Sequence, residues 1–221
     1  RAYDIHYDEP NGYIIAGFKA IDGMSSDMDG YLLKINETGD TLWSKTYGSS
    51  SNDRFRSVDN TYDGGYIMTG WTVDPVNNYE LWLVKTDSNG NVLWDSTYGG
   101  TSGDVGYCVR QVSGGYVVSG ENYGDSGPDA WLIKTDENGT LLWSQTYDLG
   151  VATMAYSFDK VGYPDYGYVL TGKVSGGAVE NCFIIKTDID GNQEWYHTFG
   201  YDYEDWGESI IAWNHGGLYS Y

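Results

Sequence analysis

The chain has few basic residues and no long hydrophobic run, and both shortages narrow the partners it can have. Its 221 residues contain 12 Lys and Arg against 32 Asp and Glu, which gives a formal net charge of -20. This charge repels phosphate backbones and anionic lipid headgroups, so we expect no nucleic-acid partner. No apolar run approaches the roughly 20 residues of a membrane-spanning helix, and no signal segment opens the chain. We therefore also expect no membrane insertion.

Cysteine is scarce. Cys108 and Cys182 lie far apart in the sequence, and each stands where the other repeats described below carry an unrelated residue. A disulfide requires two Cα atoms within about 7 Å, so we expect two unpaired thiols.

Enzyme signatures are missing as well. The chain has no Gly-x-Ser-x-Gly elbow, His-Glu-x-x-His motif, phosphate-binding glycine loop or Cys-x-x-Cys pair. The histidines His6, His197 and His215 are scattered without partner spacing. A pair of carboxylates for glycoside chemistry stays open as an alternative, because acidic residues are abundant and their pairing depends on geometry.

The chain does contain one sequence pattern four times. Each copy ends in a tryptophan, and the copies follow one another at about 50 residues, a period typical of stacked or radially arranged units. The copies occupy residues 33–43, 84–94, 133–143 and 185–195.

Each repeat contains four short runs of β-strand type and no stretch of helical period. The first run, such as 13–17, ends in small residues, and we expect it to be the innermost strand. The second run leads into a tight turn, such as Asn89-Gly90, whose residues tolerate positive φ. The third run carries the tryptophan, and the fourth is a segment such as 55–58. We predict repeats at 13–58, 66–111, 116–158 and 168–211, with partial strands at 2–7 and 217–221.

Four antiparallel strands per repeat is the layout of a β-propeller blade. The pattern Trp-Leu-Ile-Lys-Thr-Asp-x-x-Gly-x-x-Leu-Trp at 131–143 resembles a family of secreted bacterial and archaeal propeller repeats. It is more distantly similar to PQQ-type propeller repeats. The resemblance implies an all-β propeller of four-stranded antiparallel blades and says little about activity, because propellers have unrelated functions. A PQQ enzyme would carry adjacent cysteines, which this chain lacks, so we expect no organic cofactor.

The repeats predict how the units pack and how the chain is organised. We expect Trp43, Trp94, Trp143 and Trp195 to be structural and largely buried at equivalent positions of four units. We treat 1–221 as a single domain that forms a portion of a longer chain. Its incomplete terminal unit would be completed by further residues or by a partner.

Polar loops of differing length follow the first and third runs of each repeat. Irregular loops on a rigid scaffold are common recognition sites, and tolerated surface variation is the alternative. Aromatic side chains there could stack on sugars or anchor a protein, with packing between blades as the alternative. The candidate binding residues are Tyr79, Tyr123, Asp125, Tyr201, Tyr203 and Trp206.

Two further kinds of site have short sequence matches. Asp188, Asp190 and Asn192 could contribute oxygen ligands to calcium, although a plain hairpin turn explains the same residues. Asn36 and Asn138 begin glycosylation sequons, and Thr41 and Ser96 lie in patterns that resemble bacterial O-glycosylation sites.

These observations predict a non-enzymatic, extracellular or cell-surface β-propeller that binds protein or glycan. A polysaccharide-acting enzyme with a carboxylate pair on the loop face is one alternative. The other is a subunit of an extracellular assembly that is completed by strand exchange with a neighbour.

Overall fold

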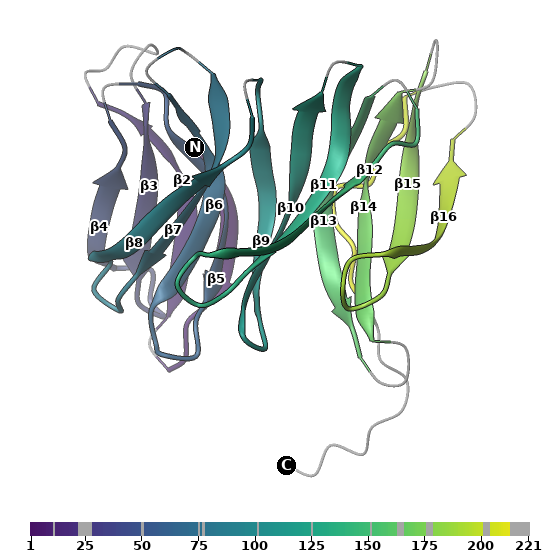
Figure 1. Ribbon diagram of the computed structural model, residues 1–221. Coiled ribbons are helices and arrows are strands. Elements are labelled where there is room, and N and C mark those ends of the chain that lie inside the picture. Colours follow the sequence, from purple (N-terminus) through teal and green to yellow (C-terminus); the bar gives the residue numbers. More distant parts are fainter. Residues whose placement is uncertain are drawn as a thin grey trace.

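The structure is a computed structural model, and its described residues form four β-sheets and no helix (Figure 1). It describes residues 1–10, 12–21, 28–49, 51–74, 76, 78–100, 102–124, 126–150, 152–162, 166–175, 179–200 and 204–212. Sixteen strands make four antiparallel sheets of four strands each, in which strands that neighbour in the chain also pair. The predicted all-β class and four-stranded antiparallel units are confirmed, and their arrangement is consistent with a propeller. Nothing in the described part of the chain is a helix long and apolar enough to cross a membrane.

The four sheets share one plan. The first contains β1 (Ala2–Tyr7), β2 (Tyr13–Ala20), β3 (Met28–Ile35) and β4 (Thr41–Tyr47). The second contains β5 (Arg54–Asn60), β6 (Tyr66–Val73), β7 (Tyr79–Thr86) and β8 (Val92–Tyr98). The third contains β9 (Val105–Val112), β10 (Gly115–Gly124), β11 (Gly127–Thr135) and β12 (Leu141–Tyr147). The fourth contains β13 (Ala152–Val161), β14 (Gly167–Ser175), β15 (Glu180–Thr187) and β16 (Gln193–Phe199).

The sheets begin one strand earlier than the predicted repeats. Residues 55–58 were expected to be the last strand of the first repeat, but they lie in β5, which pairs with β6 of the second sheet. Residues 2–7 form β1 of a complete sheet and not a strand of a partial blade. A sequence period gives the length of a unit but not the strand at which a sheet begins. The other predicted partial strand, 217–221, lies outside the described residues.

The first strands of the four sheets lie next to one another, so they are the innermost strands. Ser57 Oγ in β5 donates to Asp4 in β1 (2.8 Å), and Gln111 N in β9 donates to Asp59 in β5 (2.8 Å). Lys160 Nζ in β13 donates to the carbonyl of Gln111 (3.1 Å). The prediction that the run in β2 is innermost is therefore wrong.

The second strands contain a glycine at the end of the predicted run, but not because they are innermost. Each first strand has a β-bulge, and in β5 the register with β6 skips Arg56. A Cβ added to Gly70, which faces this bulge, would lie 1.9 Å from the carbonyl oxygen of Arg54. Glycine is required because the bulged backbone approaches so closely. The equivalent glycines are Gly17, Gly120 and Gly172.

Residues 204–212 run beside the fourth sheet, in the place that the first strand of another sheet would take. Gly207 N donates to the carbonyl of Gly172 (3.0 Å), and Ala212 N donates to Asp159 (2.8 Å). The second of these bonds repeats the one from Gln111 N to Asp59. Residues 208–211, predicted to be the last strand of the fourth repeat, therefore follow that sheet.

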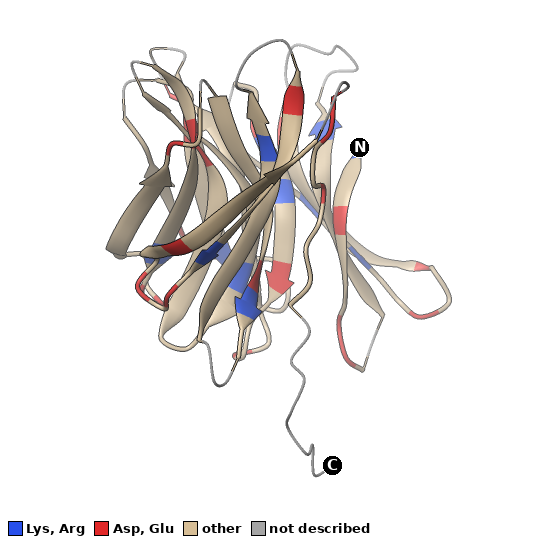
Figure 2. Cartoon of the chain, turned by 90° about the vertical axis from the view of Figure 1, so that its right-hand side faces the viewer, with Lys and Arg blue, Asp and Glu red and all other residues tan. Residues whose placement is uncertain are grey.

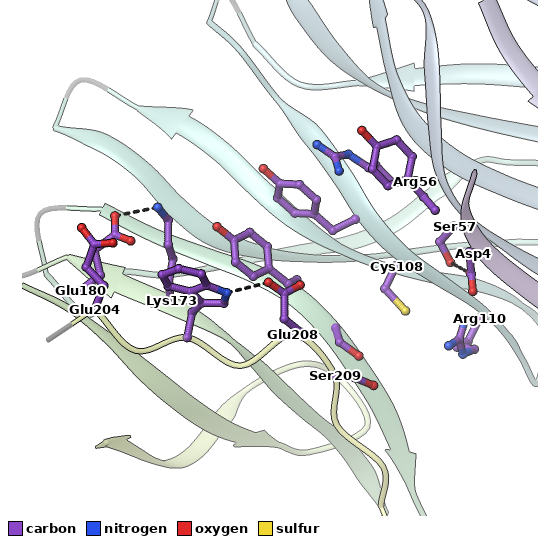
Figure 3. A pocket seen from close by; sticks show the side chains of 15 residues that line it. Asp4, Arg56, Ser57, Cys108, Arg110, Lys173, Glu180, Glu204, Glu208 and Ser209 are labelled. Carbon is purple, nitrogen blue, oxygen red and sulfur yellow. Dashed lines mark hydrogen bonds and ion pairs between the residues drawn. The ribbon is translucent and has the colours of Figure 1, made fainter. Parts of the chain in front are cut away.

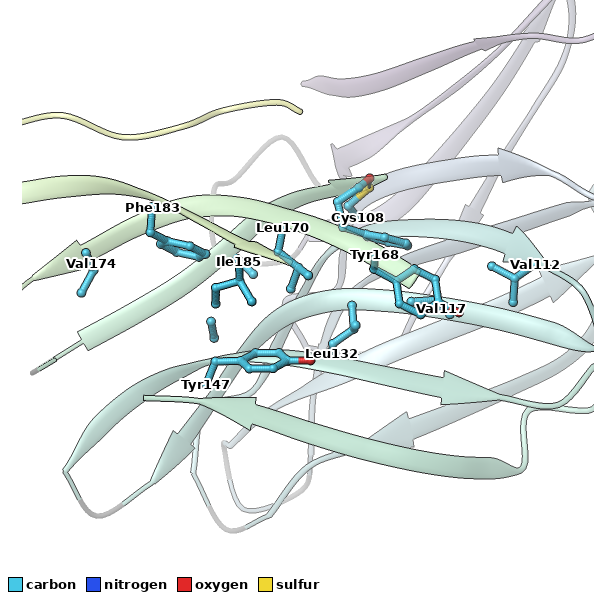
Figure 4. Close-up of a cluster of buried hydrophobic side chains, with 13 residues drawn as sticks. Cys108, Val112, Val117, Leu132, Tyr147, Tyr168, Leu170, Val174, Phe183 and Ile185 are labelled. Carbon is cyan, nitrogen blue, oxygen red and sulfur yellow. Dashed lines mark hydrogen bonds between the residues drawn. The ribbon is translucent and has the colours of Figure 1, made fainter. Parts of the chain in front are cut away.

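Three hydrophobic cores hold the molecule together, one at each contact between successive sheets. We call these contacts joints. Alternate residues of β6 serve two of them, because Tyr66 and Met68 face the first sheet whereas Ile67 faces the third. Figure 4 shows the joint between the third and fourth sheets, where Tyr147 and Leu132 meet side chains of the fourth sheet such as Ile185 and Phe183.

The repeated tryptophans extend the joints outward. Trp94 lies on β8, the last strand of its sheet, with its ring centroid 5.9 Å from that of Tyr116 in the next sheet. Trp43 and Trp143 pack in the same way and are partly buried. Trp195 is 45% exposed, because no described sheet follows β16. Joint packing is thus confirmed for three tryptophans, whereas the expected large burial is wrong, since the last strand lies at the outer edge.

Two smaller predictions are confirmed. The hairpin glycines Gly39, Gly90, Gly139 and Gly191 have φ between 73° and 88°, as the turns require. Cys108 and Cys182 are both unpaired.

Candidate binding pocket

A pocket of about 610 Å³ lies among the first strands (Figure 3). Its wall includes the bulged residue of every first strand, and a β-bulge changes the direction in which its side chain points. The bulged residues are Tyr3, Arg56, Tyr107 and Tyr156. One backbone feature, repeated four times, thus directs four side chains into one space.

A second set of side chains comes from the second strands. In each second strand a glycine faces the bulge, and the side chain in question belongs to the next residue. The four residues are Phe18, Trp71, Glu121 and Lys173. Lys173 lines the pocket, and the ring centroid of Phe18 lies 5.7 Å from that of Tyr3. The repeats share their backbone here but differ in chemistry, with two aromatic rings, one acid and one base.

A smaller cavity of about 300 Å³ adjoins the pocket, and we call it the arginine chamber. It lies between the second and third sheets, and Arg56 and Tyr107 line both spaces. The residues that line it are Asn52, Arg54, Arg56, Trp71, Tyr79, Val105, Tyr107 and Glu121.

Aromatic faces hold the two chamber arginines. The guanidinium carbon of Arg54 lies 4.5 Å from the ring centroid of Phe18 and 5.2 Å from that of Trp71. That of Arg56 lies 4.2 Å from the centroid of Tyr3 and 5.0 Å from that of Trp71. Such stacking orients a guanidinium and leaves its charge available for another partner.

Glu121 is the buried carboxyl of the chamber, with only 9% of its surface exposed. Burial raises its pKa, and the nearby charge of Asp104 raises it further. The hydrogen bond with Tyr107 and the charges of Lys173 and Arg56 act in the opposite direction. Burial also raises the pKa of Tyr107, so this phenol stays a neutral donor at ordinary pH.

Asp104 holds the loop that precedes the third sheet. Its carboxylate accepts hydrogen bonds from Gly100 N (2.8 Å), Asn122 Nδ2 (2.8 Å) and Tyr123 N (2.9 Å). Its own N–H donates to the carbonyl of Tyr79 (2.8 Å). One oxygen of this buried carboxylate is therefore bonded to the loop and the other to β10.

The opposite wall of the pocket carries acidic side chains. Figure 3 shows Arg56 and Arg110 on one side and Glu180, Glu204 and Glu208 on the other. Glu180 pairs with Lys173 (2.7 Å), and this hydrogen bond raises the pKa of Lys173.

The charge distribution supports a polar interior. Every Lys and Arg except Arg1 lies in a strand, whereas many Asp and Glu lie at turns and strand ends (Figure 2). The few basic side chains of this acidic protein are therefore concentrated on the sheets and the pocket between them.

The predicted binding residues fall into three groups. Tyr79 lines the arginine chamber, and Trp206 lines the larger pocket, where its Nε1 donates to Glu208 (2.6 Å). Tyr123 is exposed near the end of β10 and lines neither space. Asp125, Tyr201 and Tyr203 lie outside the described residues.

The residues predicted to bind calcium form a hairpin turn. Asp188 accepts from Asp190 N (2.9 Å), Asn192 N (2.8 Å) and Asn192 Nδ2 (2.9 Å), and these bonds explain the acidic turn without a metal. Over the described ranges, no three His, Cys, Asp or Glu side chains come together as a metal would need. Calcium binding stays a prediction.

The candidate glycosylation residues differ in access. Asn138 and Thr41 are exposed, whereas Ser96 is partly buried beside the next hairpin. The side-chain oxygen of Asn36 accepts hydrogen bonds from Thr38 N (3.0 Å) and Asp40 N (2.8 Å), so its amide is engaged in the turn. Modification at these residues stays a prediction.

Sequence reasoning missed the bulged residues and their neighbours in the second strands. It searched the loops for variation, but the relevant variation lies inside the repeated strands, where Phe18, Trp71, Glu121 and Lys173 occupy one aligned position. A change of chemistry at a fixed strand position was the available signal. No protein-family model matches this chain, and neither does any curated protein sequence.

Proposed function

We propose that the chain is a non-enzymatic β-propeller module that binds glycan through the pocket at its inner strands, outside the cell or on its surface. The observation that carries this proposal is the set of four bulged residues directed into one pocket of about 610 Å³. Pockets of this size, with aromatic faces and a few polar groups, suit small ligands or short segments of larger ones. The four consecutive sheets with adjacent first strands support the propeller architecture.

The aromatic residues favour a sugar as the ligand. Tyr107 and Tyr156 pack edge to face, with ring centroids 5.0 Å apart, and the polar side chains of Lys173 and Glu180 line the same pocket. Amphipathic rings next to hydrogen-bonding groups match the apolar faces and hydroxyl edges of a sugar.

Binding is favoured over hydrolysis by the state of the carboxylates. Glycoside hydrolysis requires an acid and a second carboxylate that is free to act as a base or nucleophile. Glu121 has the raised pKa of an acid, but Asp104, which acts on it electrostatically, is held by hydrogen bonds from Gly100 N and Tyr123 N. Glu180 is paired with Lys173, and Glu208 accepts a hydrogen bond from Trp206. Among the described carboxylates of the pocket this leaves Glu204 alone without a partner, so the polysaccharide-acting enzyme stays the less supported alternative.

Calorimetric titration with a panel of neutral and acidic oligosaccharides tests the proposal. We expect at least one to bind, and Tyr156→Ala to weaken it by about tenfold, because one stacking face is lost. Tyr62→Ala is the matched control, since Tyr62 is 78% exposed and lines neither space. If no oligosaccharide binds, or if both variants act alike, glycan binding at this pocket is wrong.

A second candidate function, an assembly subunit, rests on the free face of the fourth sheet. β16 is exposed along its whole length, including Trp195 and Phe199, whereas the equivalent strands contact the next sheet. We propose that this face receives strands of a neighbouring copy, with residues 204–212 as the shared first strand. Light scattering would then show a concentration-dependent oligomer that Trp195→Ser weakens, and a monomer at all concentrations would contradict it.

A further inference from the structure

The residues that line the arginine chamber carry five buried polar atoms without a hydrogen-bond partner in the described chain. The donors are Nε of Arg54, Nε of Arg56 and Nε1 of Trp71, and the acceptors are Oδ1 of Asn52 and Oε2 of Glu121. Most buried polar groups in proteins are paired, because an unpaired one loses its contacts with water and gains none in return. All five atoms belong to side chains at one cavity of about 300 Å³, and a polar ligand that enters between these side chains would supply the missing partners.

The donors select a planar anion. The guanidinium groups of Arg54 and Arg56 both stack on Trp71, so each of the two bases contacts the side chain that carries the third N–H group. Neither guanidinium forms an ion pair with a carboxylate of the described chain. A carboxylate offers two oxygens in one plane, which is the geometry that a guanidinium binds best.

The acceptors require hydroxyl groups on the same ligand. Asn52 Oδ1 and Glu121 Oε2 each need a donor, and a bare inorganic anion has none to offer. A dianion such as phosphate would also be repelled by Glu121 when that side chain is ionised. A sugar that carries one carboxylate and several hydroxyl groups satisfies both the donors and the acceptors.

The dimensions agree with one sugar residue in the chamber and its neighbours in the larger pocket. A cavity of about 300 Å³ lies at the lower end of the range for ligand sites. Arg56 and Tyr107 line both spaces, so the two spaces adjoin at these side chains. Tyr79, which packs edge to face on Trp71 with centroids 6.3 Å apart, adds an aromatic wall.

We propose that the arginine chamber binds a uronic acid residue of an acidic polysaccharide, with its carboxylate on Arg54, Arg56 and Trp71. This inference rests on the proposed glycan-binding function and adds the class of sugar. The stacked guanidinium groups are already oriented before binding, which reduces the entropy lost when the ligand enters.

The test compares trigalacturonate with its fully methyl-esterified form, by calorimetry and by tryptophan fluorescence. We expect the wild-type protein to bind the acid at least about tenfold more tightly than the ester, because esterification removes the charge that the guanidinium groups recognise. Arg54→Gln should remove most of this preference and leave the affinity for the ester within about twofold. Lys19→Gln is the matched control, since Lys19 is an exposed base that lines neither space.

Two further variants separate binding from folding. Trp71→Phe keeps an aromatic face but removes the Nε1 donor, so it should weaken the acid several-fold and not the ester. Glu121→Gln should strengthen binding of the acid, because a negative charge beside the carboxylate is removed. Thermal melts of each variant show whether the fold is retained.

The outcomes distinguish the two proposals. Equal binding of acid and ester, with no effect of Arg54→Gln, overturns the uronic acid site but leaves glycan binding in place. If triglutamate or inorganic sulfate binds as tightly as trigalacturonate, the uronic acid site is overturned as well, because the chamber would then recognise any anion. Failure of every oligosaccharide to bind overturns both.

Discussion

The three joints and the two outer faces are built from the same repeated residues, but within the described ranges only the joints are covered. At the joint between the second and third sheets, a Cβ added to Gly139 would lie 2.9 Å from the ring of Trp94. On the free face of the first sheet, the equivalent Gly39 has no described atom within 4 Å of that position. On the free face of the fourth sheet, no described glycine packs against the ring of Trp195. The comparison teaches that one repeated sequence makes both halves of a joint.

The largest expected effect comes from the tryptophan itself. Trp94→Ala should lower the free energy of unfolding by about 3 kcal/mol, because its ring fills the contact with Gly139 and Tyr116. Trp195→Ala should cost less than about 1 kcal/mol, since its ring is largely uncovered. Urea unfolding of both variants measures the difference. Equal losses would show that the free face is covered in solution.

The hairpin glycine against which the tryptophan ring packs is the other side of the joint, and two matched glycines test it. Both Gly139 and Gly39 have positive φ, so alanine at either costs about 1 kcal/mol of backbone strain. Gly139→Ala should cost about 1–3 kcal/mol more than Gly39→Ala, because the new Cβ overlaps the Trp94 ring. Thermal unfolding of the pair is sufficient, and no difference would mean that the ring moves aside.

A tyrosine at the first joint should make stability depend on alkaline pH. Burial, together with the charge of Tyr47, raises the pKa of Tyr66 from 10.0 to about 12. The unfolded chain therefore ionises first, so the contribution of Tyr66 is present below pH 10 and is lost as pH rises from about 10 to about 12.

Tyr66→Phe should remove that part of the alkaline loss, about 1 kcal/mol between about pH 9 and about pH 11. It should also lower stability at neutral pH, because Lys34 Nζ donates to the phenol (3.0 Å) and the phenol donates to Asp8 (2.6 Å). Tyr13→Phe, at the equivalent position on the free face, is the control. Chemical unfolding at several pH values gives the curves, and parallel curves for wild type and Tyr66→Phe would contradict the assignment.

The smallest expected effect comes from one hydroxyl group. Tyr147 OH donates to the carbonyl of Gly191 across the third joint (2.7 Å), so Tyr147→Phe should cost about 1 kcal/mol or less. Phe199 occupies the equivalent position on the free face, and Phe199→Tyr should leave stability within about 0.5 kcal/mol of wild type. A gain from Phe199→Tyr would indicate that this face already meets a glycine carbonyl.

The fold was predictable wherever local chemistry determined it. The Asn89-Gly90 turn requires positive φ, and the apolar run that begins at Tyr66 is typical of a buried strand, so both could be inferred from the sequence. The position of β5 could not, because a strand such as 54–60 can pair with either neighbour and only tertiary packing decides. For that reason the sequence did not indicate that each sheet begins one strand earlier than the predicted repeat.

The candidate site was less predictable than the fold. Tyr79 was found because it stands out in a loop region and lies at the start of β7. Arg56 and Tyr107 were missed, because the direction of a bulged residue depends on strand register, which the sequence does not display. Glu121 was hidden in the same way, inside a strand whose neighbouring copies carry Trp71 and Lys173 at that position.

The bulges have a consequence for how such a chain can evolve. A duplicated unit inherits both halves of the joint and therefore packs against its parent copy at once. The bulged residue and the residue after the opposing glycine lie outside the three hydrophobic cores, so mutations there leave those cores unchanged. Gene duplication can thus lengthen the array while these two positions per copy, such as Arg56 and Trp71, diverge toward a new ligand.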